Sequence, residues 1–208
     1  MAVTELAADD QAKEGPAPVR VFALVALATV AIVAYGFDQL TKYLITQNLT
    51  VGEHVPVLGE ILQFHFVKNS GAAFSLASGS TWFFSSVAAG VAVFIIWYAR
   101  RIRSMGWAIL FGMLLGGTLG NLTDRLFREP SFGLGHVVDF IQVWGFPAIF
   151  NIADSFIVAS MGLFIILSAR GIRLDGKRTQ KTASQPEPIT SAETSSPDVP
   201  PDAAAGRQ

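Results

Sequence analysis

Residues 21–37 read VFALVALATVAIVAYGF, which is 17 positions without a charged side chain. A helix needs about 20 mostly apolar residues to cross the roughly 30 Å of hydrocarbon in a bilayer. Leu40 and Leu44 continue the apolar spacing, so this stretch predicts a membrane-spanning helix. Three further stretches have the same character, at about 81–99, 104–123 and 149–169. The sequence therefore predicts four transmembrane helices.

The composition of the 208 residues agrees with a membrane protein. Hydrophobic residues make up 51% and charged residues 15%, whereas soluble domains carry about 25% charged residues. The formal net charge of −1 gives no basic field for binding nucleic acid, so DNA and RNA are excluded as partners. The chain has no cysteine, which excludes disulfides, thiol nucleophiles and iron–sulfur clusters.

Lys and Arg residues predict the orientation, because short cytoplasmic loops are enriched in them. One side of the predicted bundle holds Lys13, Arg20, Arg100, Arg101, Arg103, Arg170, Arg173, Lys177, Arg178 and Lys181, and the other holds Lys42, Lys68, Arg125 and Arg128. We therefore expect both termini in the cytoplasm and the segments 46–80 and 126–148 outside.

Segment 46–80 is expected to form a small β-rich platform. Residues 61–67 alternate in polarity, and Gly52, Pro56 and Gly59 are typical of turns. The predicted fold class is an all-α membrane protein with four transmembrane helices and this small extracytoplasmic β-rich platform. Residues 21–170 form the four-span domain, and 126–148 its second outer loop.

The two ends of the chain are expected to lie outside that domain. Residues 1–20 contain four acidic side chains and lack the basic start of a secretory signal, so we expect a cytoplasmic segment before a retained span. Residues 171–208 become rich in Pro, Ser and Thr, which predicts a disordered cytoplasmic tail.

Acidic residues near the outer ends of the spans are the candidates for chemistry, because ionisable groups at membrane depth are costly and usually functional. They are Asp38, Asp124, Asp139 and Asp154. Asn151 lies three residues before Asp154, and Asn121 three before Asp124, so each pair shares one helix face. We expect these two polar faces to meet. The glycines between Gly112 and Gly120 would allow a close helix approach.

Two carboxylates held close together share one proton and can cleave a peptide bond as an acid and base pair. The residues alone leave Asp139 and Asp154 open between such a dyad, a buried structural network and a proton relay. Asp124 with Arg125, and Asp38 with Lys42, fit structural ion pairs, the second on a helix surface. Ser75, Ser155 and His136 show no nucleophile-elbow pattern, so a serine mechanism is disfavoured.

Five blocks in the chain resemble the bacterial lipoprotein signal peptidases, also called signal peptidase II. They are DQLTK at 38–42, NSGAAFS at 69–75, GNLTDR at 120–125, VVDF at 137–140 and FNIAD at 150–154. Each block alone is weak, but five in this order within a four-span layout are highly specific.

The resemblance implies an aspartic endopeptidase of the bacterial inner membrane. Such an enzyme removes signal peptides from diacylglyceryl-modified prolipoproteins by cutting before the lipidated cysteine. It needs no metal or organic cofactor, and we expect a monomer in contact with membrane lipids. The implied catalytic pair is Asp139 and Asp154. The implied substrate-binding residues are Asn69, Gly71, Asn121, Asp124, Arg125 and Asn151, and Asp38 and Lys42 are structural.

Two functions from other classes remain alternatives. A small transporter or channel subunit would use Asp124 or Asp154 as an ion or proton site. A scaffold would use the glycine-rich third span for helix packing only. The clustering of the acids at one membrane face argues against transport, because a transport site must be reached from both sides.

Overall fold

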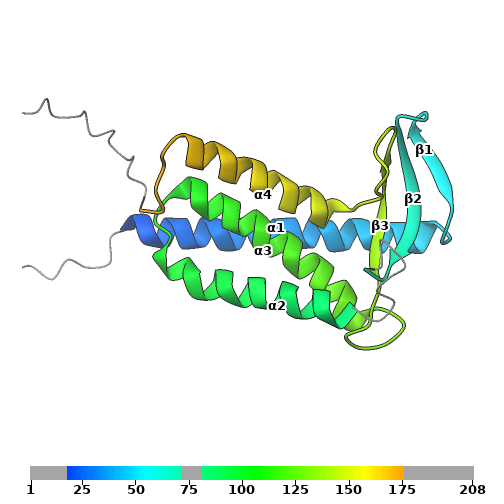
Figure 1. The fold of residues 1–208 in the computed structure, drawn as a ribbon, viewed down its shortest axis with the longest axis horizontal. Coiled ribbons are helices and arrows are strands. Elements are labelled where there is room, and N and C mark those ends of the chain that lie inside the picture. Colours follow the sequence, from blue (N-terminus) through cyan, green and yellow to red (C-terminus); the bar gives the residue numbers. More distant parts are fainter. Residues whose placement is uncertain (1–17, 72–80, 176–208) are drawn as a thin grey trace, which may run out of the picture.

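Four long helices run side by side, and a three-stranded sheet lies across one end of them (Figure 1). The structure is a computed structural model that describes residues 18–71 and 81–175. The helices are α1 (Pro18–Asn48), α2 (Thr81–Tyr98), α3 (Met105–Phe127) and α4 (Ile152–Ala169), and a short 3₁₀ turn, η1 (Ala99–Arg101), follows α2. The predictions for the acidic start, for most of the tail and for residues 72–80 lie outside the described residues.

All four predicted spans are confirmed as helices long and apolar enough to cross a membrane. Two of the differences at the helix ends have a clear cause. The third helix continues past 123 to Phe127, because the charge of Asp124 is buried in an ion pair and does not end the span. The fourth begins at Ile152 instead of 149, because Asn151 caps its N-terminus.

Close packing of α3 against its neighbours depends on glycine. A Cβ at Gly116 would lie 2.5 Å from the carbonyl oxygen of Ala31 on α1, and one at Gly117 would lie 2.6 Å from that of Ala153 on α4. Neither position has room for a side chain. This confirms that the glycines of the third span allow a close approach, and it brings the polar residues of three helices to one level.

The platform is an antiparallel sheet of β1 (His54–Leu58), β2 (Leu62–Asn69) and β3 (Val137–Val143), in that order. The first two strands confirm the predicted β-rich segment. The third corrects the expectation for 126–148, which was a second outer loop without a strand. Its first four residues are all buried, so it lacks the alternation that predicts a strand.

Helix α1 joins the bundle to the platform. Its 31 residues correspond to about 46 Å, which exceeds the hydrocarbon thickness of roughly 30 Å. The extra length reaches the sheet, where Ile45 packs with Phe66, Val138 and Phe140. The strands run across the end of the bundle (Figure 1), so residues of β2, β3, α3 and α4 meet in one place.

Candidate active site

Asp139 lies in the middle of β3 and is 2% exposed. Strand pairing sets Asp139 opposite Val67, which places Asn69 two residues further along β2. The Asn69 amide donates to Asp139 Oδ2 at 2.8 Å, and its own oxygen accepts from the Gly71 backbone N–H at 2.8 Å. The sheet therefore fixes both the position of this carboxylate and one of its donors.

Asp154 lies in the first turn of α4, where the helix dipole favours a negative charge. Asn151 is the N-cap, and the two residues form a reciprocal capping box. The Asn151 backbone N–H donates to Asp154 Oδ2 at 3.1 Å, and the Asp154 N–H donates to Asn151 Oδ1 at 3.0 Å. Asn121 on α3 also donates to Asp154 Oδ1 at 2.8 Å.

Asn151 connects the two carboxylates. Its side-chain amide donates to Asp139 Oδ1 at 2.6 Å, while its backbone N–H binds Asp154. The same amide donates to Asn121 Oδ1 at 3.1 Å, which confirms that the two predicted polar faces meet. Asp139 and Asp154 therefore lie on either side of one fully buried asparagine.

Burial controls the electrostatics of Asp139. The pKa of Asp139 is raised from 3.8 to about 6, mainly by loss of solvent and in part by the nearby charge of Asp154. Hydrogen bonds from Asn69 and Asn151 and the charge of Lys42 oppose it. A carboxyl group with such a pKa is suited to donate a proton near neutral pH.

Three completely buried charged residues lie next to this pair of carboxylates. They are Asp38, Lys42 and Asp124. Lys42 Nζ is 2.8 Å from Asp38 Oδ2 and 2.8 Å from Asp124 Oδ2. The predicted pair of Asp38 and Lys42 is therefore present, but it is not on a helix surface as expected. The expectation that Asp124 pairs with Arg125 is wrong. Arg128, one turn further along α3, binds Asp124 Oδ1 at 2.6 Å.

Arg125 instead points towards α2. Its guanidinium lies over the ring of Phe84, with Cζ 5.4 Å from the ring centroid. Nη1 is buried and has no hydrogen-bond partner among the described residues. A Cβ at Gly71 would lie 3.2 Å from this atom, so Gly71 leaves space in front of it. A buried guanidinium N–H without a partner is costly unless a ligand satisfies it.

A cavity of about 620 Å³ opens beside the two carboxylates, between α4 and the chain that leads into it. The polar part of its lining is Asn69, Asp139, Asp154 and Ser155, and the rest is Phe146, Ala148, Ile149, Phe150, Val158 and Ala159. The Ser155 hydroxyl donates to the Asn151 carbonyl oxygen at 3.0 Å. His136 lines a different cavity, with Phe66 and Lys68 of β2, so no histidine base faces Ser155 there.

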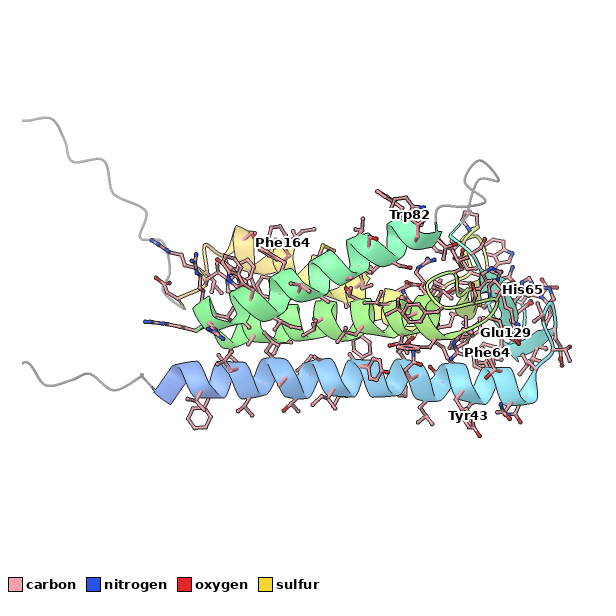
Figure 2. All side chains as sticks on the ribbon, turned by 90° about the horizontal axis from the view of Figure 1, so that it is seen from below. Tyr43, Phe64, His65, Trp82, Glu129 and Phe164 are labelled. Carbon is pink, nitrogen blue, oxygen red and sulfur yellow. The ribbon has the colours of Figure 1, made fainter. Side chains whose placement is uncertain are left out.

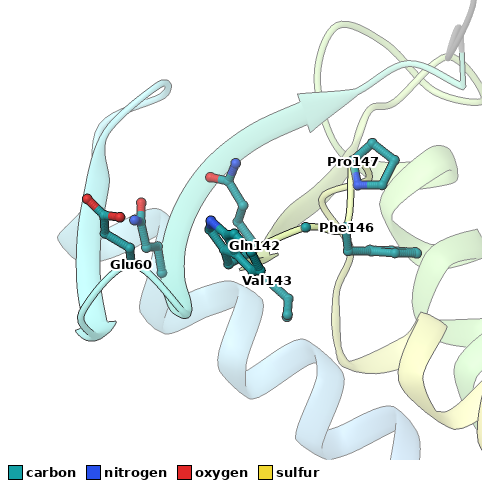
Figure 3. Close-up of a pocket in the computed structure, with 8 residues that line it drawn as sticks. Glu60, Gln142, Val143, Phe146 and Pro147 are labelled. Carbon is teal, nitrogen blue, oxygen red and sulfur yellow. The ribbon is translucent and has the colours of Figure 1, made fainter.

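Phe146 lines this cavity and also a second one of about 570 Å³ (Figure 3). The second cavity is lined by Glu60 and Gln142, among others, and Phe146 and Pro147 lie along its wall. The aromatic side chains of Tyr43 and Trp82 lie at the same end of the bundle and point away from it (Figure 2). Residues of the sheet line both cavities, so both lie at the end of the bundle that carries the sheet.

Three contributors to the site were not predicted from the sequence. Arg128 follows Asp124 at the i, i+4 helical spacing, so that spacing was the available signal. Gln39 donates to Asp38 Oδ2 at 3.1 Å, and Phe84 stacks on Arg125, but nothing in the sequence singles them out. Within residues 18–71 and 81–175, no three His, Asp or Glu side chains are grouped to hold a metal ion.

Comparison with known proteins identifies the family. Residues 30–170 match the family model described as signal peptidase (SPase) II. The chain is 65% identical over 156 residues to the lipoprotein signal peptidase of Leifsonia xyli subsp. xyli, which covers 75% of this chain and 72% of that one. It is 44% identical over 172 residues to that of Mycobacterium tuberculosis H37Rv, covering 83% and 84%.

Solved structures agree with this result. A bacterial membrane enzyme determined by the in meso method superposes with a TM-score of 0.62 and 29% sequence identity. The match covers 70% of this chain and 93% of the other. The family match includes Asp139 and Asp154, three of the four spans in full and most of the first, and the whole sheet. The chain therefore belongs to the signal peptidase II family of lipoprotein signal peptidases.

Proposed function

We propose that the chain cleaves the signal peptide from lipid-modified bacterial prolipoproteins with Asp139 and Asp154 as an aspartic dyad, cutting before the lipidated cysteine. Prolipoprotein signal-peptide cleavage itself follows from membership of the family, and it decides against the transporter and the scaffold. One observation carries the dyad assignment. Asn151 donates one hydrogen bond to each carboxylate, at 2.6 Å and 3.1 Å, beside a cavity large enough for a peptide segment.

The environments of the two carboxylates divide the acid and base roles between them. Asp139 has a raised pKa and holds the shared proton. Asp154 accepts hydrogen bonds from Asn121 and from a backbone N–H at a helix N-terminus, a position that suits a group accepting a proton from water. The structure thus supports Asp154 as the base that activates water and Asp139 as the acid.

Cleavage then follows in two steps. Asp154 takes a proton from water, the water oxygen attacks the scissile carbonyl carbon, and Asp139 protonates the carbonyl oxygen. In the second step Asp154 returns its proton to the leaving amide nitrogen, the C–N bond breaks, and a hydroxyl proton of the diol goes back to Asp139. Both carboxyl groups end in their starting states, as general acid and base catalysis requires.

The cavity fits a substrate that arrives from the membrane. Its apolar wall includes Ile149 and Phe150 before α4 and Val158 and Ala159 within α4, while the carboxylates lie at its polar end. The signal peptide would lie along this wall, and the diacylglyceryl chains would remain in the bilayer. The protein is a multi-pass protein of the bacterial inner membrane. We place both termini in the cytoplasm, because Arg100, Arg101, Arg103 and Arg170 lie at the end opposite the sheet (Figure 1).

The pH dependence of cleavage tests whether Asp139 is protonated in the active enzyme. Because burial raises the pKa of Asp139 to about 6, this carboxyl holds its proton below that pH and loses it above. We expect kcat/KM to fall as pH rises through about 6, with a slope of roughly tenfold per pH unit. A kcat/KM that still rose between pH 6 and 8 would contradict a protonated Asp139.

Arg125 is expected to bind the substrate backbone through Nη1, which has no hydrogen-bond partner in the part of the chain that the structure describes. Arg125→Met should raise KM by roughly tenfold to a hundredfold, because a hydrogen bond from a charged donor contributes about 1.5–3 kcal/mol. Arg101→Met is the matched control, since Arg101 also lies over an aromatic ring, that of Trp97, but at the opposite end of the bundle. An equal change in KM for both variants would rule out a direct contact between Arg125 and the substrate.

A further inference from the structure

A buried carboxylate holds the backbone directly before each catalytic aspartate. The N–H of Val138, which precedes Asp139, donates to Asp124 Oδ2 at 3.2 Å. The N–H of Ala153, which precedes Asp154, donates to Asp38 Oδ1 at 2.9 Å. Val138 is 1% exposed and Ala153 is 0% exposed, so water does not compete for either bond. The two attachment points are therefore equivalent, although β3 and α4 are different kinds of element.

Lys42 joins these two carboxylates. Its ammonium contacts Asp38 and Asp124 at 2.8 Å each and donates its third hydrogen bond to Asn121 Oδ1 at 2.9 Å. Asn121 in turn donates to Asp154. All the donors of Lys42 are thus used within the site, and its side chain has no exposed area.

Stability alone does not explain three buried charges at this place. Taking ions out of water costs several kcal/mol each, and a buried ion pair is often no more stabilising than apolar residues of the same volume. The buried charges are balanced here, because Asp124 also binds Arg128 at 2.6 Å. An apolar replacement would lose the two hydrogen bonds from the backbone N–H groups of Val138 and Ala153, next to the dyad.

We propose that Asp38, Lys42 and Asp124 are positioning residues that form a clamp, which sets the separation of the Asp139 and Asp154 carboxylates. The clamp rests on the proposed dyad and adds to it. Asp124 fixes the start of β3 and Asp38 fixes the start of α4, each by a hydrogen bond from the backbone. Lys42 holds these two carboxylates together. None of the three residues lines the cavity next to the dyad.

The clamp has a signature in the pH profile. Two carboxylates held close repel each other, which lowers one apparent pKa of the pair and raises the other. The profile of activity against pH is bell-shaped, with one limb for each apparent pKa of the pair. A looser clamp lets the two carboxylates move apart, so the two apparent pKa values approach each other and both limbs of the profile move inwards. The charged groups around the pair are Asp38 and Lys42 from α1 and Asp124, Arg125 and Arg128 from α3. A change of one charge alone would move both limbs in the same direction.

The test uses the full chain in detergent and the double variant Asp38→Asn with Lys42→Met. This pair removes one positive and one negative charge together, and Asp124 keeps Arg128, so no buried charge loses its last partner. We expect kcat for a lipidated prolipoprotein to fall by about tenfold to a hundredfold, because small misplacements of catalytic groups have effects of this size. We expect KM to change less than about threefold, the pH profile to narrow, and the Ala153 amide to exchange faster.

A second variant perturbs the clamp without removing a polar group. A methyl group at Gly120 would meet Asp38 Oδ2, so Gly120→Ala displaces this carboxylate. Gly36→Ala is the control, because a Cβ there meets nothing within 4 Å. We expect Gly120→Ala to lower kcat and narrow the profile, and Gly36→Ala to change neither. If the double variant does not fold, Gly120→Ala decides the question.

The clamp and the dyad fail in different ways. If Asp139→Asn and Asp154→Asn are inactive while the clamp variants keep kcat and the width of the pH profile, the clamp is wrong and the dyad stands. If a clamp variant loses activity only in proportion to its folded fraction, its residues are merely structural and the clamp is also wrong. If the dyad variants remain active, the proposed function itself fails.

Discussion

Asp139→Asn and Asp154→Asn are each expected to lower kcat for prolipoprotein cleavage by about 10³-fold or more. Asparagine has the shape of aspartate, but its amide cannot take up or release a proton at neutral pH. Each variant therefore removes one of the two proton transfers while keeping most of the packing. The measurement is single-turnover cleavage of a diacylglyceryl-modified prolipoprotein, with Glu129→Gln as a control at an exposed ion pair.

The stability of the dyad variants separates loss of chemistry from loss of fold. The pKa of Asp139 in the folded protein, about 6, lies above its ordinary value of 3.8. A raised carboxyl pKa means that folding becomes less favourable as pH rises from about 4 to about 6. Asp139→Asn has no carboxyl group to titrate at this position, so its melting temperature should depend less on pH in that range. A kcat within tenfold of the wild type for either variant would contradict the dyad.

Asn151→Ala is expected to lower both activity and stability. The change removes the side-chain hydrogen bonds to Asp139 and Asn121 and the helix cap that Asp154 N–H donates to. Loss of an N-cap lowers the free energy of unfolding by about 1 kcal/mol. Without the Asn151 side chain, the two carboxylates are no longer held in a fixed position relative to each other. We expect kcat to fall by about a hundredfold, together with a lower melting temperature.

Asn151→Ser separates these two effects. Serine caps a helix about as well as asparagine, so the melting temperature should recover most of its loss. Its hydroxyl has one hydrogen and cannot replace both bonds that the Asn151 amide donates, to Asp139 and Asn121, so kcat should stay low. If Asn151→Ser recovered full activity, Asn151 would serve the helix cap alone and would not link the carboxylates.

The spans were predictable because hydrocarbon imposes one simple requirement on length and charge. The exact helix ends were not, because they depend on contacts between distant residues. The charge of Asp124 predicts the end of the third span, yet Lys42 and Arg128 neutralise this charge and the helix continues to Phe127. The partner Lys42 lies on α1, and no local pattern near Asp124 points to it.

The choice of site residues shows the same limit. Local spacing correctly placed Asn121 and Asn151 on polar helix faces that meet. It could not select Asp139 over Asp124, because the sequence does not show that 137–143 is a strand paired with β2. The resemblance to the family made that selection. The structure then supplies a physical difference, since Asp124 is held by Lys42 and Arg128, whereas Asp139 is held by amides.

The most direct test of the aspartic mechanism is cleavage of the lipidated substrate in the presence of hydroxylamine, with the released signal peptide analysed by mass spectrometry. A dyad that activates water forms no covalent intermediate, so we expect a signal peptide that ends only in a free carboxylate. A nucleophile such as Ser155 would form an acyl-enzyme that hydroxylamine intercepts. A signal peptide ending in a hydroxamate would therefore contradict the assignment of Asp139 and Asp154.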